Sequence, residues 1–150
     1  MSTDYSTLLI AEYDHWAIYL HPNQGYLGRC VIWCKRSDAL SLTDATIEEQ
    51  QELFTALRNL EKALHNCFQP NLLNFAFLGN ETKHLHGHVI PRYKSPRKFM
   101  GIIFTDDLWG KNYRTNHGYV FSKEVLNKVR DLLKNSLRRQ HGTSSGKKRT

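Results

Sequence analysis

The chain has 150 residues, of which 40% are hydrophobic and 23% charged, values typical of a single soluble globular domain. The formal net charge is +7 at pH 7, but residues 138–150 hold five of the 21 Lys and Arg residues and no acid. A near-neutral body with a basic end is a poor match to a dedicated nucleic-acid-binding surface. The apolar runs are too short to span a membrane, and no basic stretch precedes an apolar one at the N-terminus, which argues against a secretory leader.

The cysteines Cys30, Cys34 and Cys67 are odd in number, and no two of them form a C-x-x-C pair. This pattern favours neither a disulfide framework nor a cysteine-ligated metal. We therefore expect structural thiols in a reduced, cytoplasmic protein.

The first half of the chain predicts a hairpin followed by a helix. Residues 1–14 have no clear pattern and are expected to form a lead-in. Segments 17–20 and 27–34 are predicted strands, since Val, Ile and aromatic residues dominate them and the loop between them contains Pro and Gly. Thr46 and Glu49 have the spacing of a capping box, and apolar residues then recur at helical spacing as far as Phe68.

The second half predicts two more strands and a second helix. Segments 72–78 and 84–90 are predicted strands with a short link between them, and 101–104 is a candidate for another. Residues 122–137 form an amphipathic helix with a basic outer side, and residues 139–150 are expected to be a basic disordered tail. The order of elements favours an α+β fold, an antiparallel β-sheet of about five strands with a packed amphipathic helix and an additional C-terminal helix.

Three histidines occupy alternate positions in the run His84-Leu85-His86-Gly87-His88. Because successive side chains of a strand point to opposite faces, the three rings should stand in a row on one face. A sheet core has no need of three adjacent imidazoles, each of which would require hydrogen-bond partners. The row is therefore a candidate functional site.

Two chemistries suit such a row. Imidazoles ligate zinc or copper, and they also act as nucleophile and hydrogen-bond donor around a phosphate. A catalytic metal site usually has a carboxylate close by, and the nearest acid to this strand is Glu81. The sequence thus favours phosphate chemistry, and we expect neither a metal nor another cofactor.

The run His-Leu-His-Gly-His-Val-Ile, followed by Pro91-Arg92, resembles the signature of the histidine triad (HIT) superfamily, and the preceding order of elements is similar as well. The resemblance implies a HIT-like domain over residues 15–138 that binds a nucleotide substrate and forms a homodimer. Members of the family cleave at the phosphorus nearest the nucleoside, through a nucleotidyl-histidine intermediate.

Carried onto this chain, the resemblance makes His86 the nucleophile, with His84 and His88 holding the phosphate and assisting the leaving group. Asn80 best matches the family's phosphate-contacting amide. Either His21 or Asn23 matches the position that contacts the ribose. His15 and His117 are further free histidines, and Trp109 and Tyr113 are expected to pack rather than to stack on a base.

Two residues depart from the family's pattern. Gly87 stands where a bulky hydrophobic residue is usual, which should remove packing behind the motif. Arg29, after Gly28, stands where a further histidine is common. Arginine can bind phosphate through two hydrogen bonds, but it cannot donate a proton at neutral pH.

The leading hypothesis is a hydrolase or nucleotidyl transferase acting on dinucleoside polyphosphates or nucleoside phosphoramidates. A nucleotide-binding regulatory module with little turnover is the first alternative. A nucleic-acid end-processing enzyme, steered by the basic C-terminal segment, is the second and is not favoured.

Overall fold

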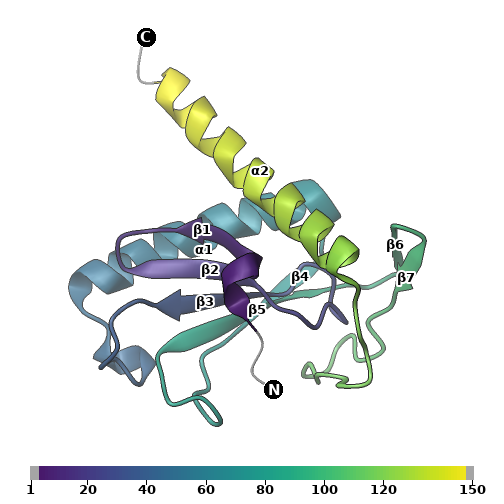
Figure 1. Ribbon diagram of the computed structural model, residues 1–150, viewed down its shortest axis with the longest axis horizontal. Coiled ribbons are helices and arrows are strands. Elements are labelled where there is room, and N and C mark those ends of the chain that lie inside the picture. Colours follow the sequence, from purple (N-terminus) through teal and green to yellow (C-terminus); the bar gives the residue numbers. More distant parts are fainter. Residues whose placement is uncertain (1–3, 148–150) are drawn as a thin grey trace.

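The computed structural model describes residues 4–147, with side chains described as far as residue 140. Five antiparallel strands form the main sheet in the order β1-β2-β3-β5-β4 (Figure 1). Their bounds are Leu9–Glu12, Trp16–Leu20, Cys30–Cys34, His86–Arg92 and Leu72–Ala76, in that order. Strands β6 (Arg97–Phe99) and β7 (Ile102–Phe104) form a separate small sheet, and short 3-10 helices span Tyr5–Leu8 and Leu42–Asp44. The α+β class and the five-stranded sheet predicted from the sequence are confirmed.

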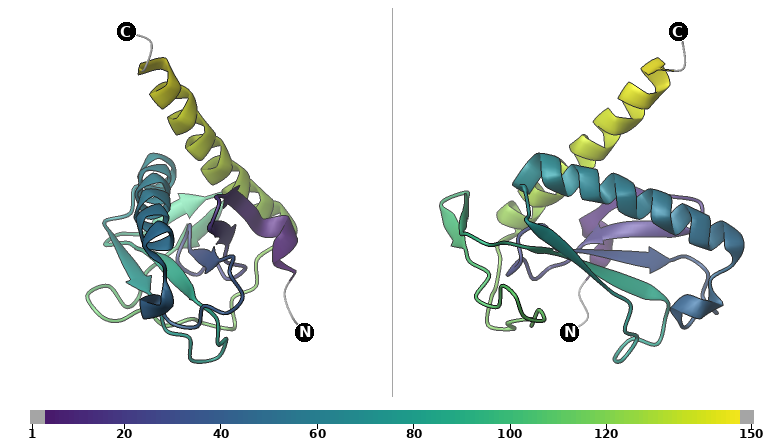
Figure 2. Two further views of the ribbon diagram at one scale, coloured as in Figure 1. Left: turned by 90° about the vertical axis from the view of Figure 1, so that its left-hand side faces the viewer. Right: turned by 180° about the vertical axis from the view of Figure 1, so that it is seen from behind.

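Helix α1 (Ile47–Phe68) covers one face of the sheet, as the views from two further sides show (Figure 2). The capping box at its start is formed as predicted, because the Glu49 amide donates to the Thr46 hydroxyl and the Glu49 carboxylate accepts from the Thr46 amide. Its buried residues, such as Leu60 and Leu64, pack into one core with the apolar side chains of β2 and β3.

The pairing of β3 with β5 sorts side chains between two faces. Ile32 lies opposite Gly87, and Trp33 lies opposite His86. Ile32 is fully buried in the core beneath α1. By alternation, His86 and the next histidine of the motif therefore face away from the helix.

Helix α2 (Lys123–Lys147) packs its first half against α1 and β1, while its second half projects from the body (Figure 1). The predicted end at residue 137 was too early. Gln140 donates a hydrogen bond to the carbonyl of Asn59 in α1, which holds the chain helical beyond that point. The segment expected to be a disordered tail is thus helical to Lys147, and residues 148–150 lie outside the described part.

The N-terminal boundary also differs from the expectation. Part of the predicted lead-in over residues 1–14 is β1, which pairs with β2 as an edge strand of the sheet. The sequence does not predict this strand, because it is short and a bulge between Leu9 and Ala11 interrupts the alternation of its side chains. No helix in the described part of the chain is long and apolar enough to cross a membrane.

Gly87 is packed tightly, contrary to the expectation of a loosened strand. A Cβ atom at this position would lie 2.5 Å from the ring of Phe77, which fills the space beside the strand. The bulk that the family places on the strand is thus supplied here by an aromatic side chain from the loop after β4.

We predict that Gly87→Ala destabilises the protein by about 1–3 kcal/mol, because the added methyl group overlaps the Phe77 ring. Chemical denaturation measures the change, and the double variant Gly87→Ala/Phe77→Leu should recover part of it. Equal stability of Gly87→Ala and the wild type would contradict the packing described here.

Candidate active site

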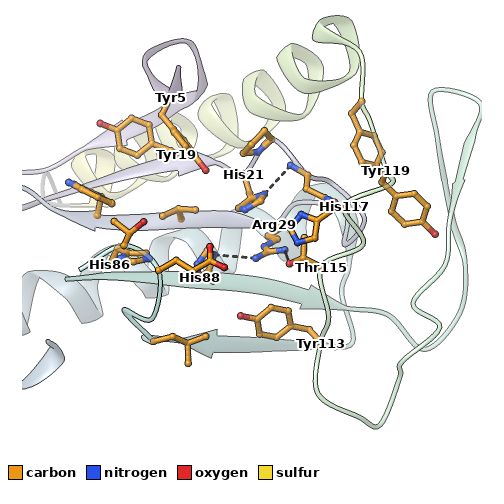
Figure 3. Close-up of a pocket in the computed structure, with 18 of the residues that line it drawn as sticks. Tyr5, Tyr19, His21, Arg29, His86, His88, Tyr113, Thr115, His117 and Tyr119 are labelled. Carbon is orange, nitrogen blue, oxygen red and sulfur yellow. Dashed lines mark hydrogen bonds between the residues drawn. The ribbon is translucent and has the colours of Figure 1, made fainter. Parts of the chain in front are cut away.

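A cavity of about 900 Å³ opens on the sheet face away from α1 (Figure 3). Its walls come from β2, β3 and β5, from the loop after β4, and from the irregular segment before α2. The polar and aromatic lining residues include Tyr5, Tyr19, His21, Asn23, Arg29, Trp33, Asn80, Glu81, His86, His88, Tyr113, Thr115, His117 and Tyr119.

His86 presents one bare ring nitrogen. Its Nδ1 lies 2.7 Å from the carbonyl oxygen of His84. Because a carbonyl only accepts hydrogen bonds, Nδ1 must carry the proton, and in the neutral ring Nε2 then holds a free lone pair. This is the form of imidazole that attacks an electrophile.

His84 supports the site from outside the main cavity. Its ring stacks on Trp33 with centroids 4.1 Å apart, and its Nε2 lies 2.6 Å from the carbonyl oxygen of Cys34. The residue precedes β5 and lines a smaller neighbouring hollow. Of the three motif histidines, only His86 and His88 line the main cavity.

His88 is held by a cation. Nη2 of Arg29 lies 3.3 Å from Nδ1 of His88, and Nη1 donates to the hydroxyl of Thr115 at 2.7 Å. Arginine only donates, so Nδ1 of His88 is the acceptor and its proton resides on Nε2. Gly28, at φ +91°, precedes Arg29, and a Cβ there would lie 2.8 Å from Leu64 in α1. Glycine is therefore required at this turn.

His21 has a fixed protonation as well. The amide of Asn23 donates to Nδ1 of His21 at 2.9 Å, which leaves the proton on Nε2. The Asn23 side chain donates to the carbonyl of Asn116 and accepts from the amide of Gly25. His21 and Asn23, the two candidates for the ribose contact, both line the cavity. Asn23 also connects the hairpin to the segment before α2 through its hydrogen bond with Asn116.

The environment keeps two of these histidines neutral. Burial, followed by the charge of Arg29, lowers the pKa of His21 to about 3 and that of His88 to about 4. Nearby His88 and His86, respectively, add to these shifts. Both rings are consequently uncharged hydrogen-bond donors at pH 7.

The cavity includes residues to which the sequence assigned no role. The expectation that Tyr113 only packs was incomplete, since its ring lines the cavity, lies beneath Arg29 and meets Tyr26 edge to face. Trp33 could have been found from the alternation that places it two residues after Val31 on the site face. The segment holding Tyr113 and His117 has no periodic pattern that would predict its place.

Among the described side chains, which extend over residues 4–140, no cluster of three or more His, Cys, Asp or Glu residues has the arrangement of a metal site. Cys30 and Cys34 are buried free thiols and Cys67 is half-buried.

Comparison with known proteins identifies the family of this chain. The model of the HIT domain matches residues 3–95, so the chain belongs to the HIT domain family. A bis(5'-adenosyl)-triphosphatase of Saccharomyces cerevisiae is 32% identical over 72 residues. That match covers 45% of this chain and 35% of the yeast enzyme, so the chain matches only about a third of this relative's length.

Solved structures share the fold. A histidine triad protein of Bradyrhizobium japonicum superposes with a TM-score of 0.68 at 19% identity, covering 86% of this chain and 89% of its own. One from Marinobacter aquaeolei has a TM-score of 0.66 at 20% identity, with 90% and 93% covered. At these identities the likeness concerns the fold alone.

We predict that the stability of the free protein falls as the pH is lowered from about 6.5 to 4.5. Unfolded histidines bind a proton near pH 6.5, whereas folded His21 and His88 do so only near 3 and 4. The unfolded state therefore binds more protons in this window, and acid favours it. Thermal unfolding at a series of pH values measures the effect.

The double variant His21→Asn/His88→Gln should show a flatter dependence in the same window. Glu49 does not affect the stability between pH 6.5 and 4.5. Arg36 lowers its pKa to about 2, so its contribution to stability is lost only below the unfolded-state pKa of 4.5. A wild-type melting temperature that is constant between pH 6.5 and 4.5 would refute this account.

Proposed function

We propose that the protein is a nucleotide phosphohydrolase that cleaves a nucleotide conjugate at its α-phosphate, with His86 as the nucleophile. The observation that carries the proposal is the hydrogen bond of His86 to the His84 carbonyl, which leaves Nε2 as a lone-pair donor beside the cavity. Membership in the HIT family and the partial likeness to a bis(5'-adenosyl)-triphosphatase support the same chemistry.

In the first step, Nε2 of His86 bonds to phosphorus while the bond from phosphorus to the leaving group breaks and its electron pair departs with that group. The ring becomes a nucleotidylated imidazolium whose proton stays on Nδ1, where it is donated in a hydrogen bond to the His84 carbonyl. In the second step, the oxygen of a water bonds to phosphorus, the P–N bond returns its electron pair to Nε2, and the water proton passes to solvent. The product is a nucleoside monophosphate.

Of the other expected site residues, His84 lies outside the main cavity, whereas His88, Asn80, His21, Asn23 and Arg29 line it. His88 offers its Nε2 hydrogen to a phosphate oxygen, and Arg29 lies directly behind it. Asn80 lies in the loop that forms the opposite wall, where its amide can reach the same phosphate. His21 offers a donor on the hairpin side, where we place the ribose, with Asn23 beside it.

We expect His86→Ala to abolish release of AMP from diadenosine triphosphate, because none of the other described histidines that line the main cavity has a lone-pair nitrogen fixed by a backbone carbonyl in this way. The measurement is chromatographic detection of AMP, with a rate at least about a thousandfold below wild type. His65→Ala, an exposed histidine at the end of α1, is the matched control and should retain wild-type turnover.

If wild type binds AMP but releases none from diadenosine polyphosphates, phosphoramidates or other nucleotide conjugates, the protein is instead a nucleotide-binding module. Equal turnover by His86→Ala and wild type would exclude the covalent mechanism.

We also propose that two copies pair through β4 and α1. Strand β4 lies at the edge of the sheet, and its backbone groups on that side are open to another strand. Beside it, a largely apolar groove of about 750 Å³ runs between α1 and β4. Leu72, Phe75 and Phe54 are 51%, 47% and 57% exposed along this surface, and large apolar side chains exposed together are typical of an interaction site.

We predict that sedimentation velocity gives a dimer for wild type and a monomer for Phe54→Glu/Phe75→Lys, because the charges would be buried in the pairing surface. Val120→Lys, at an exposed position that lines the main cavity and not this groove, serves as the control for adding charge. A wild type that stays monomeric at about 100 μM would contradict the pairing. The cytoplasmic location expected from the free thiols remains a proposal.

A further inference from the structure

Two arginines are buried in the part of the chain whose side chains are described, and they differ in what neutralises them. Arg92 is 2% exposed and forms an ion pair at 2.7 Å with the carboxylate of Asp106, which is also buried. Arg29 is 3% exposed, and no carboxylate in the described part of the chain pairs with it. Its partners are the neutral groups of Thr115 and His88 and the face of Tyr113.

A buried cation without a counter-charge is costly. Burial lowers the pKa of Arg29, yet a guanidinium still keeps its proton at neutral pH. Because Arg29 lines the histidine cavity, the missing negative charge can come from a ligand in that cavity. Even the Nε of Arg29 has no hydrogen-bond partner, so the fold itself does not satisfy this side chain.

Arg29 also limits what His88 can do. To act as a proton donor, the ring would have to become an imidazolium with hydrogens on both nitrogens. A hydrogen on Nδ1 would then face Nη2 of Arg29, itself a donor, at 3.3 Å. His88 can therefore give a hydrogen bond through Nε2 but cannot hold a second proton to hand over.

Figure 3 shows the labelled rings of His86 and His88 with Arg29 beyond them along the same face. Of the other histidine rings that line the cavity, those of His21 and His86 are each fixed with a single proton, whereas His117 lies at an exposed position on the irregular segment before α2. Nδ1 of His21 accepts from the Asn23 amide, which leaves this ring a single proton, and its ring lies 5.8 Å from that of His88. Nδ1 of His86 holds its proton against the His84 carbonyl.

We propose that Arg29 is a specificity-determining residue that restricts this site to substrates whose leaving group departs as a stable anion. Phosphate anhydrides satisfy this condition, because a nucleoside diphosphate leaves with its electron pair and needs no proton. A phosphoramidate does not, because its amine must gain a proton as the P–N bond breaks. Arg29 acts through His88 as a positioning residue, and it supplies the positive charge that a leaving anion requires. This inference rests on the proposed hydrolase function.

The test uses three adenylates that differ only in the leaving group. Diadenosine triphosphate releases ADP, the p-nitrophenyl ester of AMP releases a stable anion that carries no phosphate, and adenosine 5'-phosphoramidate releases an amine. Wild type should hydrolyse the first two and cleave the phosphoramidate at least about a hundredfold more slowly than the ester, the range that a missing general acid costs. Cleavage of the phosphoramidate within tenfold of the ester overturns the proposal.

Substitutions at position 29 separate charge from proton transfer. Arg29→His, which can accept as well as donate, should raise the ratio of phosphoramidate to ester cleavage at least tenfold. Arg29→Lys, a cation that only donates, should keep the wild-type ratio. Arg114→His is the matched control, because this exposed arginine lies next to Thr115 in the chain but does not line the cavity. An unchanged ratio in Arg29→His overturns the proposal.

Nitrogen NMR of the histidine rings gives a readout that needs no turnover. At pH 7, His88 of wild type and of Arg29→Lys should be protonated on Nε2 alone. In Arg29→His the ring should populate the other tautomer or the imidazolium. A protonated Nδ1 of His88 in wild type overturns the proposal, even if no adenylate is cleaved and the hydrolase function itself fails.

Discussion

The hydrogen bond between Nδ1 of His86 and the main-chain carbonyl of His84 is the constraint on which the chemistry of this molecule depends. It decides which nitrogen of the ring carries a lone pair, because the backbone carbonyl can only accept a hydrogen bond. The same device recurs at His21, where a backbone amide sets the tautomer. Main-chain groups and one arginine thus assign donor and acceptor roles before any ligand arrives, which is the preorganisation that catalysis requires.

That constraint depends in turn on the central strands. β3 and β5 present core residues such as Ile32 and Val89 toward α1, and they present Trp33 and the histidines to the cavity. The fit of Phe77 against Gly87 keeps the core side closed at the point where the strand has no side chain. The rigidity of the site is therefore a property of the hydrophobic core beneath it.

Sequence patterns predicted those parts of the molecule that periodicity controls. The capping box, the helix to Phe68 and the direction of His86 and His88 follow from local spacing and appear in the structure, whereas His84 precedes β5 and lies outside the main cavity. The first strand was not predicted because it is short and bulged. The C-terminal helix was underestimated because a tertiary hydrogen bond from Gln140 prolongs it.

Within the site, the sequence shows that Arg29 departs from the pattern of the HIT family. Only the structure shows that no described carboxylate pairs with it. The residues between Tyr113 and Phe121 follow no repeating pattern, and their position depends on long-range contacts such as that of Asn23 with Asn116. The roles of the site residues remain predictions, while the family and the fold are established.

The alternation of side chains along β5 also limits how such a protein can change its substrate over evolutionary time. A shift of the strand register by one residue would turn Val89 toward the cavity and a histidine toward the hydrophobic core. The substrate preference therefore cannot change through small shifts of this strand. New substrate preferences must instead arise through substitutions at the edge of the cavity, in the hairpin turn and in the irregular segment before α2. Substitutions in these two loops leave the hydrophobic core unchanged. A single scaffold can thereby diversify what it accepts while the reacting centre stays fixed.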